Sequence, residues 1–391
     1  MPLHEDMLRE ILLRLPPQPS SLLRASVVCK HWRGLVTDPR FLRRFRTHQG
    51  KPPLIGVFEA RSHVNGINFR SILDPPDRIP PERFDVQRQI DGRTGIRLLG
   101  CRHGRVLLLD LKRHKLIVCD PITSEHQCFA APPVFRGLSI YGAVLCAAAD
   151  QGHVHGSCHS SSFKVVLMSL GGDGDEDEYN NTTPIACVYS SETGVWGNII
   201  AAADQCELAD SNPGILVGNV LYWSSKSVSN TTIFIDDLTD DIVEFDLDRP
   251  SLAVIKGPPC LNFSLRHQII RAEDDALGLA IFSHCRFEVW QRMVNCHGGT
   301  TWLLHNAFET HTLLGLPPRI RGMKILGYDE DKDAIFLFVD ANVYMVQLLS
   351  MQFRRLYESC YPINCHPFAS FYAADIAIPE GRNGVGILHG A

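Results

Sequence analysis

The first fifty residues carry apolar side chains at the spacing of short amphipathic helices. Between residues 5 and 15, apolar positions recur at i, i+3, i+4 and i+7 and form one stripe: Leu8, Ile11, Leu12 and Leu15. Pro16-Pro17 ends this first predicted helix, because proline removes a backbone donor and clashes with the preceding turn. Acidic residues in its first turn, Glu5 and Asp6, suit the positive end of the helix dipole.

Two further helices are predicted before residue 50. One runs from Pro19 to about Gly34 and carries Cys29 and His31, with an expected buried side of Leu22, Leu23, Ala25, Val27, Val28, Trp32 and Leu35. Asp38-Pro39, an N-cap followed by proline, predicts the start of the third. Three short helices cannot hide this much apolar surface from water, so the pattern predicts that another protein covers part of it.

Beyond residue 50 the pattern changes to short β-rich runs separated by Gly, Pro, Asp and Asn. The predicted strands are 53–58, 105–110, 115–120, 163–170, 185–190, 214–223, 241–247, 252–257, 277–283, 286–291, 323–329, 334–339 and 343–349. They recur in units of about 45–55 residues, which is the size of a four-stranded propeller blade. Five units are clear, and we expect "PLIGVF" near residue 53 and "FASFYAADIAI" near the C-terminus to share a closing blade, for six or seven in all.

The net charge of the chain also changes sign near residue 50. Residues 1–50 hold nine basic and four acidic residues, a net charge of +5, whereas the rest of the chain carries −10. The basic head favours an acidic partner, and the total of −5 argues against nucleic-acid binding. No apolar run is long enough for a membrane span. The thirteen cysteines are scattered, with no Cys-x-x-Cys pair, so we expect free thiols and a cytoplasmic or nuclear location.

Four groups of residues are candidates for a catalytic or metal site, and none has the residue spacing that such a site requires. Cys29 and His31 lack an orienting acid or a second thiol. The acidic segment 171–178 lacks the register of a calcium loop. The cluster of His153, His155, Cys158 and His159 is the best metal candidate, but its ligands are too densely spaced and no second pair is evident. Cys360 and Cys365-His366 are weaker still. We therefore expect no metal, no cofactor and no catalytic residues.

The tryptophans of the β-rich part, Trp196, Trp223, Trp290 and Trp302, are expected in blade cores rather than in a ligand cage. Motifs of α/β-hydrolases, phosphate loops and zinc proteases are absent from the sequence. The β-rich part is therefore predicted to bind rather than to catalyse.

The segment "LHEDMLREILLRLPP…SLLRASVVCKHWRGLVTDPRFLRRF" resembles an F-box, the helical module that docks on the Skp-type adaptor of cullin ubiquitin ligases. The family usually opens with Leu-Pro, whereas this chain has Leu3-His4. Loss of the proline restores a backbone N–H and removes apolar contact, so weaker docking is expected. The resemblance implies that eight residues bind the adaptor or support the binding surface: Leu3, His4, Leu8, Ile11, Leu15, Leu22, Val28 and Trp32.

The β-rich part resembles the associated domain of plant-type F-box proteins, on "ACVYSSETGVW" and "ILVGNVLYW", and the Tyr189–Trp196 pair is similar to a kelch repeat. The resulting expectation is a mixed architecture: a three-helix F-box at 1–47, a linker at 48–53 and an all-β, propeller-like domain at 54–391. The resemblance implies a non-catalytic subunit that tethers an unknown protein substrate to a cullin ligase. Two alternatives stay open: a propeller enzyme or carbohydrate-binding protein with a helical head, and a scaffold without ligase output.

Overall fold

The computed structural model describes residues 5–60, 66–90, 92, 94–148, 153–156, 158, 161–171, 183–208, 213–226, 241–258, 266–282, 286–295, 299–313, 315 and 323–372. Residues 1–50 belong to one compact unit and residues 51–370 form a second. We call them the helical unit and the propeller.

The helical unit contains four helices, where three were predicted: α1 (Glu5–Leu13), α2 (Pro19–Ser26), α3 (Lys30–Thr37) and α4 (Pro39–Gln49). The predicted second helix is interrupted at residues 27–29. Cys29 has extended backbone angles (φ −163°, ψ 169°), and its Sγ accepts a hydrogen bond from the backbone N–H of Trp32 at 3.5 Å. Cys29 thus caps α3 instead of lying within a helix, and apolar spacing alone does not reveal such a cap.

The start of α4 agrees with the sequence, and its end does not. The Asp38 carboxylate accepts from the backbone N–H of Arg40 at 2.9 Å, which confirms the predicted N-cap. The helix then continues through Gln49, so two residues of the predicted linker are helical. The Gln49 amide donates to the carbonyl oxygens of Leu13 and Leu15 at 3.0 and 2.9 Å and thereby ties α4 to the end of α1.

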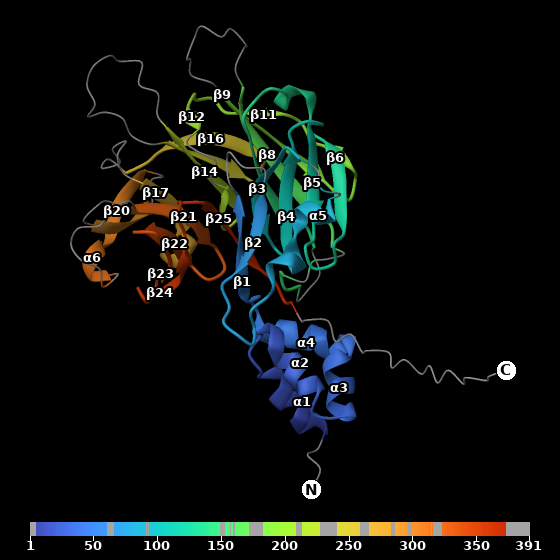
Figure 1. Ribbon diagram of the computed structural model, residues 1–391. Coiled ribbons are helices and arrows are strands. Elements are labelled where there is room, and N and C mark those ends of the chain that lie inside the picture. Colours follow the sequence, from blue (N-terminus) through green and yellow to red (C-terminus); the bar gives the residue numbers. More distant parts are fainter. Residues whose placement is uncertain are drawn as a thin grey trace, which may run out of the picture. The chain divides into compact units, whose positions relative to one another are not determined.

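The described strands of the propeller form six sheets, which confirms the predicted repeat architecture (Figure 1). Five are blades with antiparallel neighbours in chain order. The first is β3 (Ile96–Arg102), β4 (Arg105–Asp110), β5 (Lys115–Cys119) and β6 (His126–Ala130). The second is β7 (Ile140–Cys146), β8 (Phe163–Gly171), β9 (Thr183–Ser190) and β10 (Val195–Trp196), with β11 (Ile200–Ala201) also on β9.

The third blade is β13 (Ile215–Val217), β14 (Val220–Lys226), β15 (Asp241–Asp246) and β16 (Ser251–Lys256), with β12 (Glu207–Leu208) beside β14. The fourth is β17 (Arg266–Arg271), β18 (Leu277–Phe282), β19 (Arg286–Val294) and β20 (Thr300–Glu309). The fifth is β21 (Met323–Asp329), β22 (Ala334–Val339), β23 (Asn342–Gln347) and β24 (Phe353–Glu358). Every strand predicted from the sequence overlaps one of these strands or β1 (Leu54–Ala60). Two short helices lie between strands: α5 (Val86–Gln89) and α6 (Thr310–Leu313).

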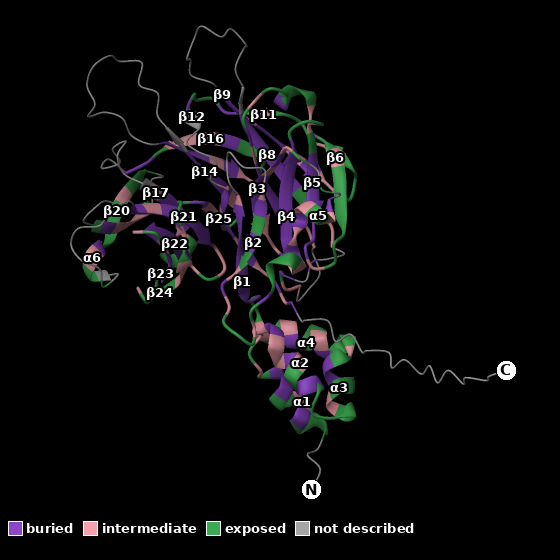
Figure 2. Ribbon diagram, in the orientation of Figure 1, coloured by how far each residue is buried: buried purple, intermediate pink, exposed green. Residues whose placement is uncertain are grey.

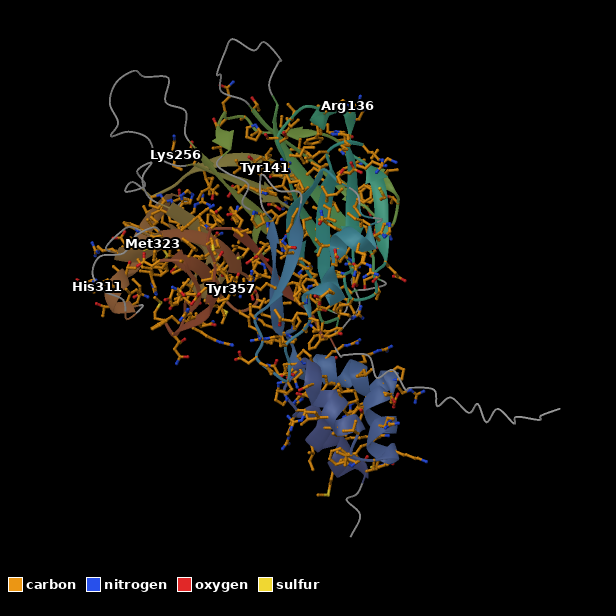
Figure 3. The ribbon with its side chains drawn as sticks, viewed as in Figure 1. Arg136, Tyr141, Lys256, His311, Met323 and Tyr357 are labelled. Atoms are coloured by element: carbon orange, nitrogen blue, oxygen red, sulfur yellow. The ribbon has the colours of Figure 1, made fainter. Side chains whose placement is uncertain are left out.

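The sixth sheet closes the ring, as the sequence predicted. In it β1 (Leu54–Ala60) pairs with β2 (Ile67–Ser71) on one side and with β25 (Asn364–Ala369) on the other. β25 contacts the inner strands of both neighbouring blades, β21 and β3. Tyr357, labelled in Figure 3, donates its hydroxyl hydrogen to the Glu59 carboxylate at 2.7 Å, which joins the fifth blade to the closing sheet.

Most middle strands are largely buried and the outer strands are more exposed, which accounts for their different sequence patterns (Figure 2). All six residues of β4 and of β22 are buried: β22 is apolar throughout, and β4 has a valine and three leucines between Arg105 and Asp110. The outer strand β6 is exposed at four of its five residues and is correspondingly polar. The apolar clusters lie between adjacent blades, so it is blade-to-blade packing that forms the core of the propeller.

Candidate functional site

The helical unit exposes large apolar side chains at two places. On α1, Met7 is 58% and Ile11 is 48% exposed, whereas Leu8 and Leu12 of the same helix are buried. In the turn between α2 and α3, Val27 is 68% and Val28 is 60% exposed. Single exposed apolar residues are ordinary, but four on about fifty residues suit a surface that a partner protein covers.

The eight residues predicted to bind the adaptor, or to support the binding surface, differ in how far they are buried. Two are buried in the core of the helical unit, Leu8 and Leu22. Two are partly buried against that core, Leu15 and Trp32. Two are exposed, Ile11 and Val28. The remaining two, Leu3 and His4, lie outside the described residues.

Met7 and Val27 are exposed apolar residues that were not among the eight. Val27 was placed on a buried helix side because α2 and α3 were predicted as one helix. Once Cys29 caps α3, the two valines fall in the connecting turn. Met7 precedes the stripe by one position, so it lies next to the buried stripe on the exposed side of α1.

The metal candidate of the sequence is a four-residue cluster in the structure, and the expectation that it lacked further ligands is wrong. Cys146, the last residue of β7, joins His153, His155 and Cys158. The Nε2 atom of His153 lies 3.3 Å from the Sγ of Cys146 and 3.2 Å from the Sγ of Cys158. The spacing Cys-x6-His-x-His-x2-Cys could have revealed it. His159 and the acidic segment 172–178 lie outside the described residues.

Electrostatics within this cluster favour one thiolate. A hydrogen bond from Cys158 lowers the pKa of the Cys146 thiol, burial opposes this effect, and a hydrogen bond from His155 adds to it. Burial and the charges of neighbouring His155 and Arg102 lower the pKa of His103, whose ring stacks on that of His155 with centroids 3.7 Å apart. The His103 ring is therefore neutral near pH 7 and lies beside the cluster.

The other cysteine and histidine residues considered as chemical sites lie in places that suit a role in the fold. Cys29 is exposed and caps α3, as described above. Cys360 is exposed, whereas Cys365 and His366 are buried on β25. Burial lowers the pKa of His366 to about 4, so this imidazole is neutral near pH 7.

The tryptophans lie in or against the blade cores. Trp223 is almost fully buried, and Trp196, Trp290 and Trp302 are partly buried. Trp302 packs against the apolar cluster of the third to fifth blades, and its Nε1 donates to the carbonyl oxygen of Lys256 at 2.9 Å. This arrangement agrees with the core role predicted for them.

An ion pair joins three blades at one end of the inner strands. Arg102 ends β3, and its side chain makes two hydrogen bonds to the carboxylate of Glu330, one from Nε at 2.9 Å. Glu330 also accepts from the backbone N–H of Leu216 at 2.7 Å. The exposed fractions of the Arg102 and Glu330 side chains are only 9% and 20%. They line a small cavity of about 50 Å³, too small for a substrate.

A larger open pocket of about 560 Å³ lies between the fourth and fifth blades. Two close contacts join side chains of its lining: Arg271 Nε lies 3.6 Å from Asp275, and His305 Nε2 lies 3.3 Å from Glu273. Such a pocket suits a polar peptide segment of a protein partner. Among the described residues, no helix combines the length and apolar content needed to cross a membrane.

Comparison with known proteins agrees with both units. The family described as "F-box domain" matches residues 2–44, and the family described as "F-box protein AT5G49610-like, beta-propeller" matches residues 97–373. The Arabidopsis thaliana F-box/kelch-repeat protein At3g23880 is 22% identical over 65% of this chain and 65% of its own length. The F-box/kelch-repeat protein At3g17530 of the same plant is 26% identical over 42% of this chain and 40% of its own length.

Another relative has a higher sequence identity, but only over a short segment. The A. thaliana F-box protein At3g17710 is 43% identical over 56 residues, which is 14% of each chain. The chain spans only 40% and 65% of the length of the first two relatives. Among solved structures, the PQQ-bound aldose sugar dehydrogenase of Streptomyces coelicolor is 11% identical, with a TM-score of 0.38 over 80% of this chain and 88% of that chain. That likeness supports no inference about chemistry.

Proposed function

Because this chain belongs to the family of F-box proteins with an AT5G49610-like β-propeller, we propose that it is the substrate-recognition subunit of a Skp–cullin–F-box ubiquitin ligase. An F-box joined to a propeller is the arrangement of an F-box substrate-adaptor type protein. In the proposed complex the helical unit binds a Skp-type adaptor, and through it a cullin, while the propeller binds the target protein. We place this complex in the cytoplasm or nucleus.

The proposed mechanism is proximity. Tethering the target near the ubiquitin-carrying enzyme raises its effective concentration, so the chain itself forms and breaks no bonds. The open pocket between the fourth and fifth blades is a candidate contact for the target, because basic and acidic side chains such as Arg271 and Asp275 line it together.

The observation that carries the proposal is the exposure of Met7, Ile11, Val27 and Val28 on a unit whose other described large apolar side chains are buried or partly buried. Burying such side chains against a partner stabilises a complex by roughly 1.5–3 kcal/mol each. The net charge of +5 over residues 1–50 complements an acidic adaptor and speeds association.

The test is a pulldown of the full chain with a purified Skp-type adaptor. We expect Ile11→Asp combined with Val28→Asp to abolish binding, because both side chains are exposed and the change should leave the helical core intact. The matched control is Leu111→Asp combined with Leu349→Asp, two propeller leucines that are 55% and 76% exposed. Undiminished binding by the first variant would contradict the proposal, and so would equal loss in the control.

A further inference from the structure

We propose that Cys146, His153, His155 and Cys158 bind one zinc ion, which fixes the connection between β7 and β8 to the propeller. The four ligand atoms lie within 4.8 Å of one another, although the first and last ligands are twelve positions apart in the sequence. Two thiols and two imidazoles are the ligand set of structural zinc sites.

The distances agree with a tetrahedral site. Tetrahedral zinc with bonds of about 2.0–2.3 Å holds its ligand atoms about 3.3–3.8 Å apart. Here the sulfur–nitrogen distances are 3.3 Å for Cys146 to His153, 3.2 Å for His153 to Cys158 and 3.8 Å for Cys158 to His155. The remaining pairs of ligand atoms lie within 4.8 Å of one another, so the side chains have to move by up to about 1 Å to receive the ion.

Charge and ligand softness select the metal. Two thiolates balance the charge of a divalent ion, so a site with two neutral imidazoles has no net charge and suits partial burial. Sulfur and imidazole ligands favour zinc over calcium, magnesium or manganese, which prefer oxygen.

Neighbouring residues hold the ligands in place, as the outer partners of metal sites do. The backbone N–H of Cys146 donates to the Nδ1 of His103 at 3.0 Å, and the His103 ring stacks on His155. The buried guanidinium of Arg105 donates to the carbonyl oxygens of Cys158 and Ser161. His103 and Arg105 flank the turn between β3 and β4, so the preceding blade supports the site.

The same connection contacts the closing sheet. Ser370, directly after β25, donates its hydroxyl hydrogen to the carbonyl oxygen of Gly156 at 2.8 Å. Gly156 has φ +88°, and a Cβ atom there would lie 2.6 Å from the side chain of Pro52. Gly156 thus lies against Pro52, near the start of the propeller chain, and Ser370, at its end, and zinc bound by His155 and Cys158 would hold it there.

The test begins with the full chain purified under reducing conditions without chelator, whose zinc content is measured by plasma mass spectrometry. We expect about one zinc per chain, and at least a tenfold loss in Cys146→Ser combined with His153→Gln. The control carries the same chemical changes on the exposed outer strand β6, His126→Gln combined with Cys128→Ser, and should keep its zinc. Equal zinc in both variants, or none in the unmodified protein, would overturn the proposal.

A second measurement needs no variant. The unmodified chain is stripped with chelator and titrated with Co²⁺. We expect a thiolate-to-cobalt charge-transfer band and intense visible bands of tetrahedral cobalt, saturating at about one equivalent. Their absence would overturn the proposal, as would a Cys146–Cys158 disulfide in metal-free protein that had been kept reduced. Neither measurement depends on adaptor binding through α1. A negative result would therefore contradict the zinc site without contradicting the proposed ligase function.

Discussion

The indole Nε1 of Trp196, on β10, donates a hydrogen bond to the carbonyl oxygen of Ala130, the last residue of β6, at 2.9 Å. Trp302 makes the same bond two blades later, to Lys256 at the end of β16. In both cases a tryptophan on the outer strand of one blade ties down the outer strand of the preceding blade. Edges that would otherwise be free are thereby fixed.

Replacing either tryptophan with phenylalanine should weaken the propeller modestly. Trp196→Phe keeps most of the aromatic packing with Phe129 and Tyr189 but removes the hydrogen-bond donor. We expect the free energy of unfolding to fall by about 1 kcal/mol, measured by urea denaturation with far-ultraviolet circular dichroism. Trp302→Phe should behave alike. No change in either variant would show that these bonds do not hold the blades.

The Arg102–Glu330 pair should stabilise the ring more strongly. Arg102→Met leaves the Glu330 carboxylate without its main partner in a mostly buried site, which typically costs about 3–5 kcal/mol. Adding Glu330→Gln removes the stranded charge and should recover part of the loss. A double-mutant cycle measured by urea denaturation tests this prediction, and strictly additive losses would contradict it.

Glycine in the inner strands should be replaceable only where the backbone leaves space. A Cβ atom on Gly327 of β21 would lie 2.2 Å from the carbonyl oxygen of Cys365 on β25, so the two inner strands would have to separate. We expect Gly327→Ala to cost about 1–3 kcal/mol or more. The control is Gly100→Ala on β3, whose nearest neighbours would be 3.6 Å away. Melting temperatures should rank Gly327→Ala well below Gly100→Ala, and the reverse order would refute the argument.

Acid should weaken the propeller through His366. Burial lowers its pKa to about 4, whereas an unfolded histidine titrates near pH 6.5, so the unfolded state takes up the proton first as pH falls. The free energy of unfolding should therefore decrease between about pH 6.5 and 4, by up to roughly 3 kcal/mol from this group. Burial raises the pKa of Asp329 to about 7, which acts in the opposite sense.

Comparing variants isolates the histidine. His366→Gln should flatten the decline in stability between pH 6.5 and 4.5, measured by urea denaturation at each pH, because the titrating group is gone while Asp329 remains. The exposed His126→Gln should keep the slope of the unmodified protein. A slope unchanged by His366→Gln would contradict the prediction.

The sequence predicted the repeat and its closure because middle strands such as β4 and β22 are buried on both faces. Runs such as "RVLLLD" at β4 and "AIFLFV" at β22 are readable without any tertiary information. The two-residue strand β10 and the polar strand β6 depend on neighbours that lie elsewhere in the chain. Their positions follow from the sheet and not from local composition.

The candidate sites were harder to predict for the same reason. Whether Ile11 or Leu8 faces a partner depends on which side of α1 packs against the other helices, and both belong to one apolar stripe. The break at Cys29 arises from a side-chain cap that periodicity does not show. The metal candidate predicted from the sequence did not include Cys146, which the return of the chain before β8 brings next to the other three ligands.

The pairing of β1 with β25 has a consequence for biosynthesis. A ribosome releases β1 early, yet the partner for one edge of that strand emerges only after five complete blades. During this interval the nascent chain holds an open arc with an unpaired apolar strand, which is exposed to wrong pairing or capture by a chaperone. Premature termination anywhere before residue 364 would leave that arc permanently open.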